Sequence, residues 1–219
     1  MNEYNLQVTV IVDVFRAFAT ASYVLDRYPC RYIYTTKSSV LSRLSLQYSD
    51  ALFIGKNEIG ADVYYHIPNS PTRVTEVNVS KRTIFHRTEA GAKGILSATG
   101  VDIILGASFV NAKATVAYIQ SLCAPKVTIV PMGHEAMDPS LEDNLCAQYI
   151  HALLRHKPFD IAPFISDLQQ GPGQCFFGKD QWQYPEEDFK RCLEVDRFHF
   201  AIRANLCGDY AQLTRCLVF

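Results

Sequence analysis

Residues 8–20, VTVIVDVFRAFAT, decide the fold of this chain. Five apolar or β-branched residues run directly into an aspartate, and an apolar pattern at helical spacing then continues to Leu25. This order is typical of a buried strand, a tight turn and a helix. In open α/β sheets, ligands bind beyond the carboxyl ends of the strands, which is where Asp13 and Arg16 stand. The stretch therefore predicts an α/β fold with a candidate site at its first strand end.

Two interpretations of Asp13 and Arg16 stay open on this stretch alone. In the functional one, the carboxylate holds Mg²⁺ and the guanidinium clasps a phosphate or carboxylate through two parallel hydrogen bonds. In the structural one, Asp13 caps the helix that follows it, as aspartate commonly does, and Arg16 is a surface charge.

The chain up to residue 155 alternates between strand-like and helix-like segments. Strands are expected over residues 31–36, 51–55, 83–88, 102–108 and 126–132, and helices over 38–47, 89–96, 111–122 and 140–155. Such alternation predicts βαβ units, and hence a three-layer α/β/α fold with a mostly parallel sheet. We expect a single domain over residues 1–219, or two closely packed βα halves within it.

Two regions depart from this alternation. Residues 56–76 contain glycines and prolines without a long period, and they predict an irregular loop of the kind that is often functional. The tail predicts helices over 160–169 and from 185, and strands over 198–202 and 213–219.

Composition excludes several classes of protein. The formal net charge of −1 provides no basic surface for nucleic acid. No apolar run approaches the ~20 residues of a membrane span, and residues 1–5 lack the basic region of a signal peptide. The seven cysteines include no CxxC pair, which favours reduced thiols. We therefore expect a cytoplasmic protein without nucleic-acid or membrane partners.

Polar residues follow several of the expected strands. In a parallel sheet the strand carboxyl ends share one rim, which would carry Asp13, Thr88, Ser108 and Gly133. Thr88 with Gly91, and Ser108 with Asn111, place hydroxyls, an amide and free backbone N–H groups at helix starts, where anions bind. Ordinary helix capping is the alternative interpretation of both pairs.

Two further motifs have both a structural and a functional interpretation. Asn69-Ser70-Pro71 in the long loop is typical of a turn. Glu142 and Asp143 open the last long helix of the alternating section, where acids stabilise the helix dipole but are also candidate metal ligands or a general acid/base. Ser140 followed by Asp143 is close to a capping box.

Taken in order, these stretches resemble the 2-phosphosulfolactate phosphatase family. The resemblance covers most of the chain and rests on six blocks: residues 13–17 (DVFRA, near the family's DVLRA), 69–71 (NSP), 88–91 (TEAG, near TxxG), 106–112 (GASFVNA, near GSFLNA), 142–147 (EDNLCA, an ED–CA helix) and 188–200. One block is weak evidence, whereas six in order are typical of a family member.

The resemblance implies a Mg²⁺-dependent hydrolase that converts 2-phosphosulfolactate to sulfolactate and phosphate, a step of coenzyme M synthesis. Its catalytic candidates are Asp13, Arg16, Glu142 and Asp143, with Arg16 as the phosphate or sulfonate clamp. Its metal candidates are Asp13, Glu58 and Glu142. Its substrate-binding candidates are Asn69, Ser70, Thr88, Gly91, Ser108 and Asn111. The partner is a small phosphorylated acid, and we expect a homo-oligomer. Metal-bound water and a side chain both remain open as the nucleophile.

One departure from the family pattern lies in the first long loop. The family's GExxG reads Gly55-Lys56-Asn57-Glu58-Ile59-Gly60 here, so the acid is displaced and Glu58 becomes its candidate replacement. This departure favours an alternative function, in which a non-catalytic relative binds a small anionic metabolite.

Overall fold

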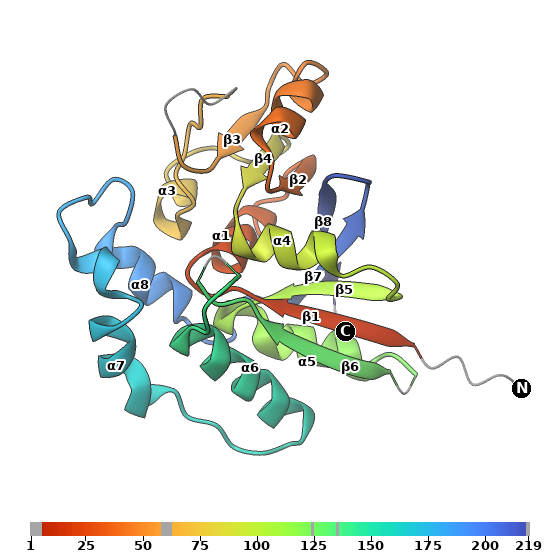
Figure 1. Ribbon diagram of the computed structural model, residues 1–219, viewed down its shortest axis with the longest axis vertical. Helices are drawn as coiled ribbons and strands as arrows, with labels where there is room; N and C mark the ends of the chain where they lie inside the picture. Colours follow the sequence, from red (N-terminus) through yellow and green to blue (C-terminus); the bar gives the residue numbers. More distant parts are fainter. Residues whose placement is uncertain (1–5, 58–62, 124, 135, 218–219) are drawn as a thin grey trace, which may run out of the picture.

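The computed structural model describes residues 6–57, 63–123, 125–134 and 136–217. It is an α/β protein with helices on both faces of an eight-stranded mixed sheet, which confirms the predicted three-layer fold (Figure 1). The strands are β1 Gln7–Val12, β2 Arg31–Thr35, β3 Leu52–Ile54, β4 Thr83–Arg87, β5 Ile103–Ala107, β6 Lys126–Pro131, β7 Phe200–Leu206 and β8 Ala211–Leu217. The helices are α1 Ala17–Leu25, α2 Ser38–Ser45, α3 Pro71–Thr75, α4 Ala90–Ser97, α5 Ala112–Gln120, α6 Leu141–Leu154, α7 Ile165–Gln170 and α8 Glu186–Cys192. Short 3₁₀ turns are η1 Phe109–Asn111, η2 Ala162–Phe164 and η3 Gln174–Phe177.

The sheet consists of two parallel groups joined by an antiparallel hairpin. Its strand order is β3-β4-β2-β8-β7-β5-β1-β6. β1 pairs in parallel with β5 and β6, and β4 pairs in parallel with β2 and β3. The β7–β8 hairpin pairs antiparallel with β5 on one side and with β2 on the other. Three antiparallel steps separate the groups, so their strands run in opposite senses.

This reversal corrects the prediction of one shared rim. The end of β4 at Thr88 does not belong to the rim formed by the ends of β1, β5 and β6, because the hairpin inserts between the two groups. The segment after β4 nevertheless contacts the segment after β1, because the start of α4 lies beside Asp13. The Gly91 amide donates to the Asp13 carboxylate over 2.9 Å.

β1 lies deep in the core because every residue from Val8 to Val12 is buried. Figure 1 shows α4 in front of the sheet and α5 behind it; α4 packs on β1 and β5, and α5 packs on β5 and β7. Burial on both faces explains the continuous apolar run that marks this strand in the sequence. Asp13 is the first residue beyond it, so the core positions the candidate site.

The predicted irregular loop over 56–76 is wrong in its last part. Residues 71–75 form α3, and the side chain of Ser70 accepts a hydrogen bond from the Arg73 amide over 3.1 Å. A cap residue followed by proline at the first helical position is a recognised start signal. The helix is only five residues long, so it has no apolar period to detect.

Two further expectations concern cysteines and membranes. All seven cysteines fall within the described ranges, and none of them is disulfide-bonded. Among the helices described here, none is both long and apolar enough to cross a bilayer.

Candidate active site

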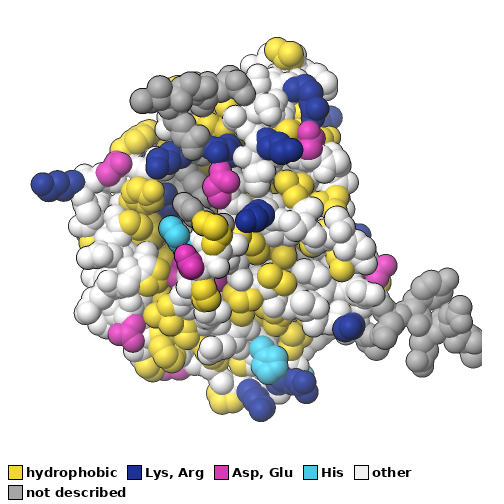
Figure 2. Space-filling model, viewed as in Figure 1, with side chains coloured by type: hydrophobic (Ala, Val, Ile, Leu, Met, Phe, Trp, Pro, Cys, Tyr) yellow, Lys and Arg dark blue, Asp and Glu magenta, His cyan; other side chains and the backbone are white. Residues whose placement is uncertain are grey.

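A cleft of about 720 Å³ opens where the turn after β1, the start of α4, the start of α6 and the segment between α7 and α8 converge. Its charged lining residues are Asp13, Glu89, Glu142, Asp143, Arg16, Lys56 and Arg87, with His134 beside them. Figure 2 shows acidic, basic and histidine side chains gathered on this face, around the start of α4. The predicted catalytic residues therefore come together, although 130 positions separate Asp13 from Asp143.

Asp13 is buried and bound through both carboxylate oxygens. Oδ1 accepts a hydrogen bond from the Ala17 amide over 3.0 Å, and Oδ2 accepts one from the Gly91 amide over 2.9 Å. Burial raises the pKa of Asp13 to about 6, although these two bonds and the charge of Arg16 oppose the rise. Asp13 thus holds the start of α1, as the structural interpretation predicts, and it also lines the cleft.

The backbone of Gly91 lies so close to Asp13 and Tyr34 that no larger residue fits at this position. A Cβ built there would lie 2.5 Å from the Tyr34 hydroxyl oxygen and 3.0 Å from Asp13 Oδ2. Gly91 does not line the cleft. Its backbone amide donates a hydrogen bond to Asp13, which does.

Asp143 grips the other side of the same turn. Its Oδ1 accepts the Val14 amide and its Oδ2 accepts the Gly133 amide, both over 2.8 Å. The predicted capping box with Ser140 is therefore wrong, because the long-range contacts take both oxygens. Burial raises the pKa of Asp143 well above its usual value, and the charges of Asp13 and Glu142 raise it further.

Glu142 lines the cleft beside them and is 7% exposed. Its Oε2 atom is buried without a hydrogen-bond partner among the described residues, and burial raises the pKa of its carboxyl group. Buried polar atoms nearly always have a hydrogen-bond partner. The Oε2 atom of Glu142 is therefore a candidate contact for a bound ligand or metal ion.

The cleft presents carboxylate oxygens, which are the ligand type that hard cations such as Mg²⁺ take. No set of three or more His, Cys, Asp or Glu residues in the described part of the chain forms an all-protein metal cage. Mg²⁺ does not need one, because it is typically held by one or two carboxylates together with waters and substrate phosphate oxygens. Asp13 and Glu142 provide such oxygens.

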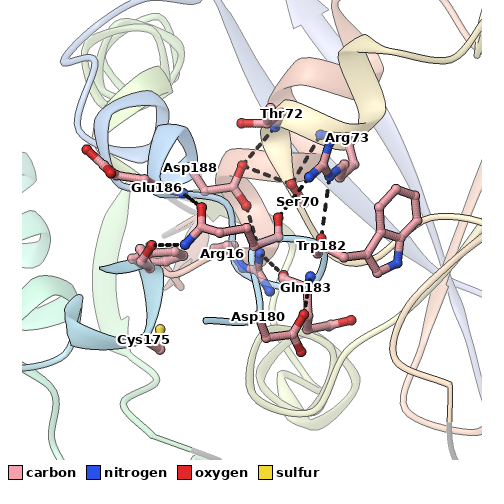
Figure 3. Close-up of polar contacts among 12 residues, drawn as sticks. Arg16, Ser70, Thr72, Arg73, Cys175, Asp180, Trp182, Gln183, Glu186 and Asp188 are labelled. Atoms are coloured by element: carbon pink, nitrogen blue, oxygen red, sulfur yellow. Dashed lines mark hydrogen bonds and ion pairs between the residues drawn. The ribbon is translucent and has the colours of Figure 1, made fainter. Parts of the chain in front are cut away.

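Arg16 is the buried cation of the cleft, and the alternative that it is a surface charge is wrong. It is 6% exposed, and its Nη1 atom donates to Asp188 Oδ2 and to the Gln183 carbonyl, both over 2.7 Å (Figure 3). Its guanidinium carbon lies 4.7 Å from the ring centroid of Tyr184 and 5.5 Å from that of Phe176. Stacking and hydrogen bonds thus hold the guanidinium in one orientation.

Asp188 organises this part of the cleft from a fully buried position. Its Oδ1 accepts the Ser70 hydroxyl over 2.9 Å and the Thr72 amide over 2.8 Å, while Oδ2 binds Arg16 (Figure 3). Asp188 was not among the site residues predicted from the sequence, because an acid in the first turn of a helix is usually a partner of the helix dipole. Ser70 lies behind the cleft and donates to this carboxylate.

The remaining predicted binding residues divide into two groups. Asn69 and Thr88 line the cleft, and the Thr88 hydroxyl donates to the Tyr34 hydroxyl over 3.1 Å. Ser108 and Asn111 do not line it and are fully buried. Asn111 accepts the Ser108 amide over 2.9 Å, which is the capping interpretation. Glu58 lies outside the described residues.

Several lining residues were not selected from the sequence. They include Lys56, Arg87, His134, Cys175 and Tyr184. Lys56 and Arg87 stand at the ends of β3 and β4, so the strand-end rule could have found them. Cys175 and Tyr184 come from the tail, where no local pattern marks proximity to Asp13.

Comparison with known proteins agrees with this arrangement. A family model described as 2-phosphosulpholactate phosphatase matches residues 1–204. The chain is 22% identical over 214 residues to the probable 2-phosphosulfolactate phosphatase of Bacillus subtilis (strain 168), covering 96% of this chain and 92% of the relative. It is 24% identical over 194 residues to the probable 2-phosphosulfolactate phosphatase of Thermoplasma acidophilum, covering 87% and 82%. The resemblance seen in the sequence is thereby confirmed, and this chain belongs to the 2-phosphosulfolactate phosphatase family.

Proposed function

We propose that the protein is a Mg²⁺-dependent phosphoric monoester hydrolase of a small phosphorylated acid, and that it converts 2-phosphosulfolactate to sulfolactate and phosphate. One observation carries the proposal. Three buried carboxylates, Asp13, Glu142 and Asp143, share a cleft with the buried guanidinium of Arg16 in a member of a phosphatase family. Phosphoryl transfer relies on positioning and on positive charge at the phosphoryl oxygens.

Asp13 and Glu142 would hold the metal. Bound there, Mg²⁺ would neutralise charge on the phosphoryl oxygens and lower the pKa of a bound water. Glu142 fits this role through the unpartnered Oε2 atom. Asp13 fits it because both its oxygens already sit in fixed hydrogen bonds, so its orientation is set before any ligand arrives.

Arg16 would bind the phosphate. Asp188 and Gln183 accept hydrogen bonds from its Nη1 atom. Arg16 lines the cleft, so its other guanidinium nitrogens would be the donors to a phosphate bound there. A fixed guanidinium loses little freedom when it binds a phosphate with two parallel bonds.

Asp143 would supply the proton to the departing alkoxide. Burial and neighbouring charge hold its pKa well above its usual value, and an efficient general acid needs a pKa near the working pH. Its hydrogen bonds to Val14 and Gly133 keep the carboxyl group in place during transfer.

Phosphate release from a panel of small phosphorylated acids, with Mg²⁺ or with EDTA, tests this function. We expect release from 2-phosphosulfolactate that EDTA abolishes, and a loss of at least about 100-fold in kcat/KM for Asp13→Ala and Glu142→Gln, because each removes a charge used in the transition state. Lys93→Ala, an exposed change on α4 away from the cleft, is the matched control. A folded protein that releases no phosphate from any compound contradicts the proposal.

One observation favours a second candidate, a non-catalytic protein that binds a small anionic metabolite. Lys56 lines the cleft at the position where the family pattern has an acid. Thermal stabilisation by sulfolactate without turnover of any ester would support this candidate. For either function, the unpaired cysteines support the expected cytoplasmic location.

A further inference from the structure

We propose that Lys56 recognises a second anionic group of the substrate, a carboxylate or sulfonate carried beside the phosphate. This inference rests on the proposed function and assigns a specificity-determining residue to it. Lys56 lines the same cleft as Asp13 and Arg16, but it comes from a different part of the fold, just after the edge strand β3.

The position of Lys56 follows from strand register. Ile54 pairs in parallel with His86 of β4 on one side and with Ile67 on the other. Lys56 comes two residues after Ile54, as Thr88 does after His86 and Asn69 does after Ile67. The register thus places Lys56, Thr88 and Asn69 in a row, each two residues beyond one of these neighbouring paired positions, and all three line the cleft.

This row leads toward the reaction centre. Thr88 precedes the start of α4, and the Gly91 amide of that helix binds Asp13. Lys56 is one strand further from Asp13 than Thr88 is. A phosphate at Asp13 and Arg16 would thus leave Lys56 to meet a group elsewhere on the same small molecule.

Within the part of the chain that the structure describes, no acid is paired with Lys56. Among the lysine and arginine side chains known to line the cleft, Arg16 is paired with Asp188, and Arg87 donates to Glu89 over 2.6 Å. Lys56 has no hydrogen bond or ion pair with any residue that the structure describes. An ammonium at a cleft wall that no described residue engages favours an anionic ligand group.

Asn69 adds a second polar group to this wall. Its amide oxygen is buried without a hydrogen-bond partner among the described residues. That oxygen is a hydrogen-bond acceptor and does not itself bind an anion, so among the described residues of this wall Lys56 is the group that a second acid of the substrate would meet. A substrate that carries a further acid group on the carbon skeleton gives the ammonium its counter-charge.

Three esters of the same secondary-alcohol type separate this role from phosphate binding. 2-Phosphosulfolactate carries a carboxylate and a sulfonate, 2-phospholactate carries a carboxylate, and isopropyl phosphate carries no further acid. Steady-state kinetics of Lys56→Ala, Lys56→Arg and the wild type on all three would measure KM and kcat separately, with Lys93→Ala as the matched exposed-lysine control.

We expect Lys56→Ala to raise KM for the acid-bearing esters about tenfold with kcat within twofold, as loss of one charge-assisted contact predicts. Lys56→Arg should retain most of the affinity, and isopropyl phosphate should show no change. Equal losses on all three esters, or no difference from Lys93→Ala, would overturn the inference.

Calorimetric binding of sulfolactate keeps the inference testable without turnover. If no ester is hydrolysed but sulfolactate binds about tenfold more weakly to Lys56→Ala, the hydrolase proposal fails and the role of Lys56 stands. If the wild type and Lys56→Ala bind sulfolactate equally, or neither binds it, the role of Lys56 is refuted.

Discussion

Arg16 and Asp188 stand 172 positions apart in the chain, yet their side chains form a buried ion pair with an N–O distance of 2.7 Å. The same carboxylate accepts the Ser70 hydroxyl and the Thr72 amide through its other oxygen. One acid on α8 thereby joins the turn after β1 to the start of α3. A buried pair of this kind costs desolvation energy, and its benefit here is a guanidinium held in one place at the cleft.

We predict that Asp188→Asn lowers both stability and activity. Removing one partner of a buried pair leaves an uncompensated charge and typically costs about 3–5 kcal/mol, and a mobile Arg16 should lower kcat/KM. Urea unfolding and phosphate release measure the two effects. Glu187→Gln changes the neighbouring residue, whose side chain is 47% exposed, and should stay within about 0.5 kcal/mol of the wild type. An Asp188→Asn protein as stable as Glu187→Gln would contradict the role given to the pair.

A second prediction concerns the tight approach at Gly91. Gly91→Ala places a Cβ 2.5 Å from the Tyr34 hydroxyl oxygen, so it should destabilise the protein by about 1–3 kcal/mol through overpacking. Tyr34→Phe removes that oxygen. In a double-mutant cycle followed by urea unfolding, we expect the double variant to be more stable than the sum of the single changes predicts. Strict additivity would show that the Tyr34 oxygen is not the obstacle.

A third prediction links Mg²⁺ to the acidic cluster. The charge of Asp13 raises the pKa of Glu142, and the charge of Glu142 raises the pKa of Asp143, so Glu142→Gln should raise the melting temperature of the metal-free protein while abolishing activity. Mg²⁺ should stabilise the wild type in proportion to the logarithm of its concentration above Kd, and this shift should disappear in Glu142→Gln.

Glu89→Gln is the control for this experiment. Glu89 also lines the cleft, but its side chain is 58% exposed and is paired with Arg87. It should retain the Mg²⁺-dependent shift in melting temperature. An equal shift in Glu142→Gln would remove Glu142 from the metal site.

The fourth prediction is a pH dependence of stability that arises from His86. This imidazole is fully buried, accepts or donates one hydrogen bond with the Tyr32 hydroxyl over 2.7 Å, and has an unpartnered Nε2 among the described residues. Burial, with a smaller effect from the charge of Arg16, lowers its pKa from 6.5 to about 3. Between about pH 6.5 and pH 3, His86 is therefore protonated in the unfolded chain but neutral in the folded protein.

Stability from this residue is consequently full above pH 6.5 and is lost as the pH falls toward 3, by at most about 1.4 kcal/mol per pH unit. Urea unfolding of the wild type and of His86→Gln from pH 8 to pH 4 checks it. The difference between their unfolding free energies should change in favour of the variant as the pH falls. A constant difference would mean that His86 titrates alike in both states.

Much of the fold could be predicted from the sequence because its signals are local. The apolar run that ends at Asp13 and the alternation up to residue 155 predicted the strands of both parallel groups and the helices that follow them. The short helix α3 and the β7–β8 hairpin in the centre of the sheet could not be placed in this way. The first has no period, and the second comes from the tail, whose pairing partners lie far away in the chain.

The sequence by itself determined the elements and the chemistry available at their ends, because burial pattern, caps and residue type act over a few neighbouring positions. It placed Asp13 beyond a buried strand, and Glu142 with Asp143 at a helix start. Only the tertiary structure decided which of these residues share a cleft and which lie behind it. It gave Arg16 its partner Asp188, turned Ser108 and Asn111 into a cap, and set Lys56 in a row with Thr88. Such contacts join distant segments, and no local pattern records them.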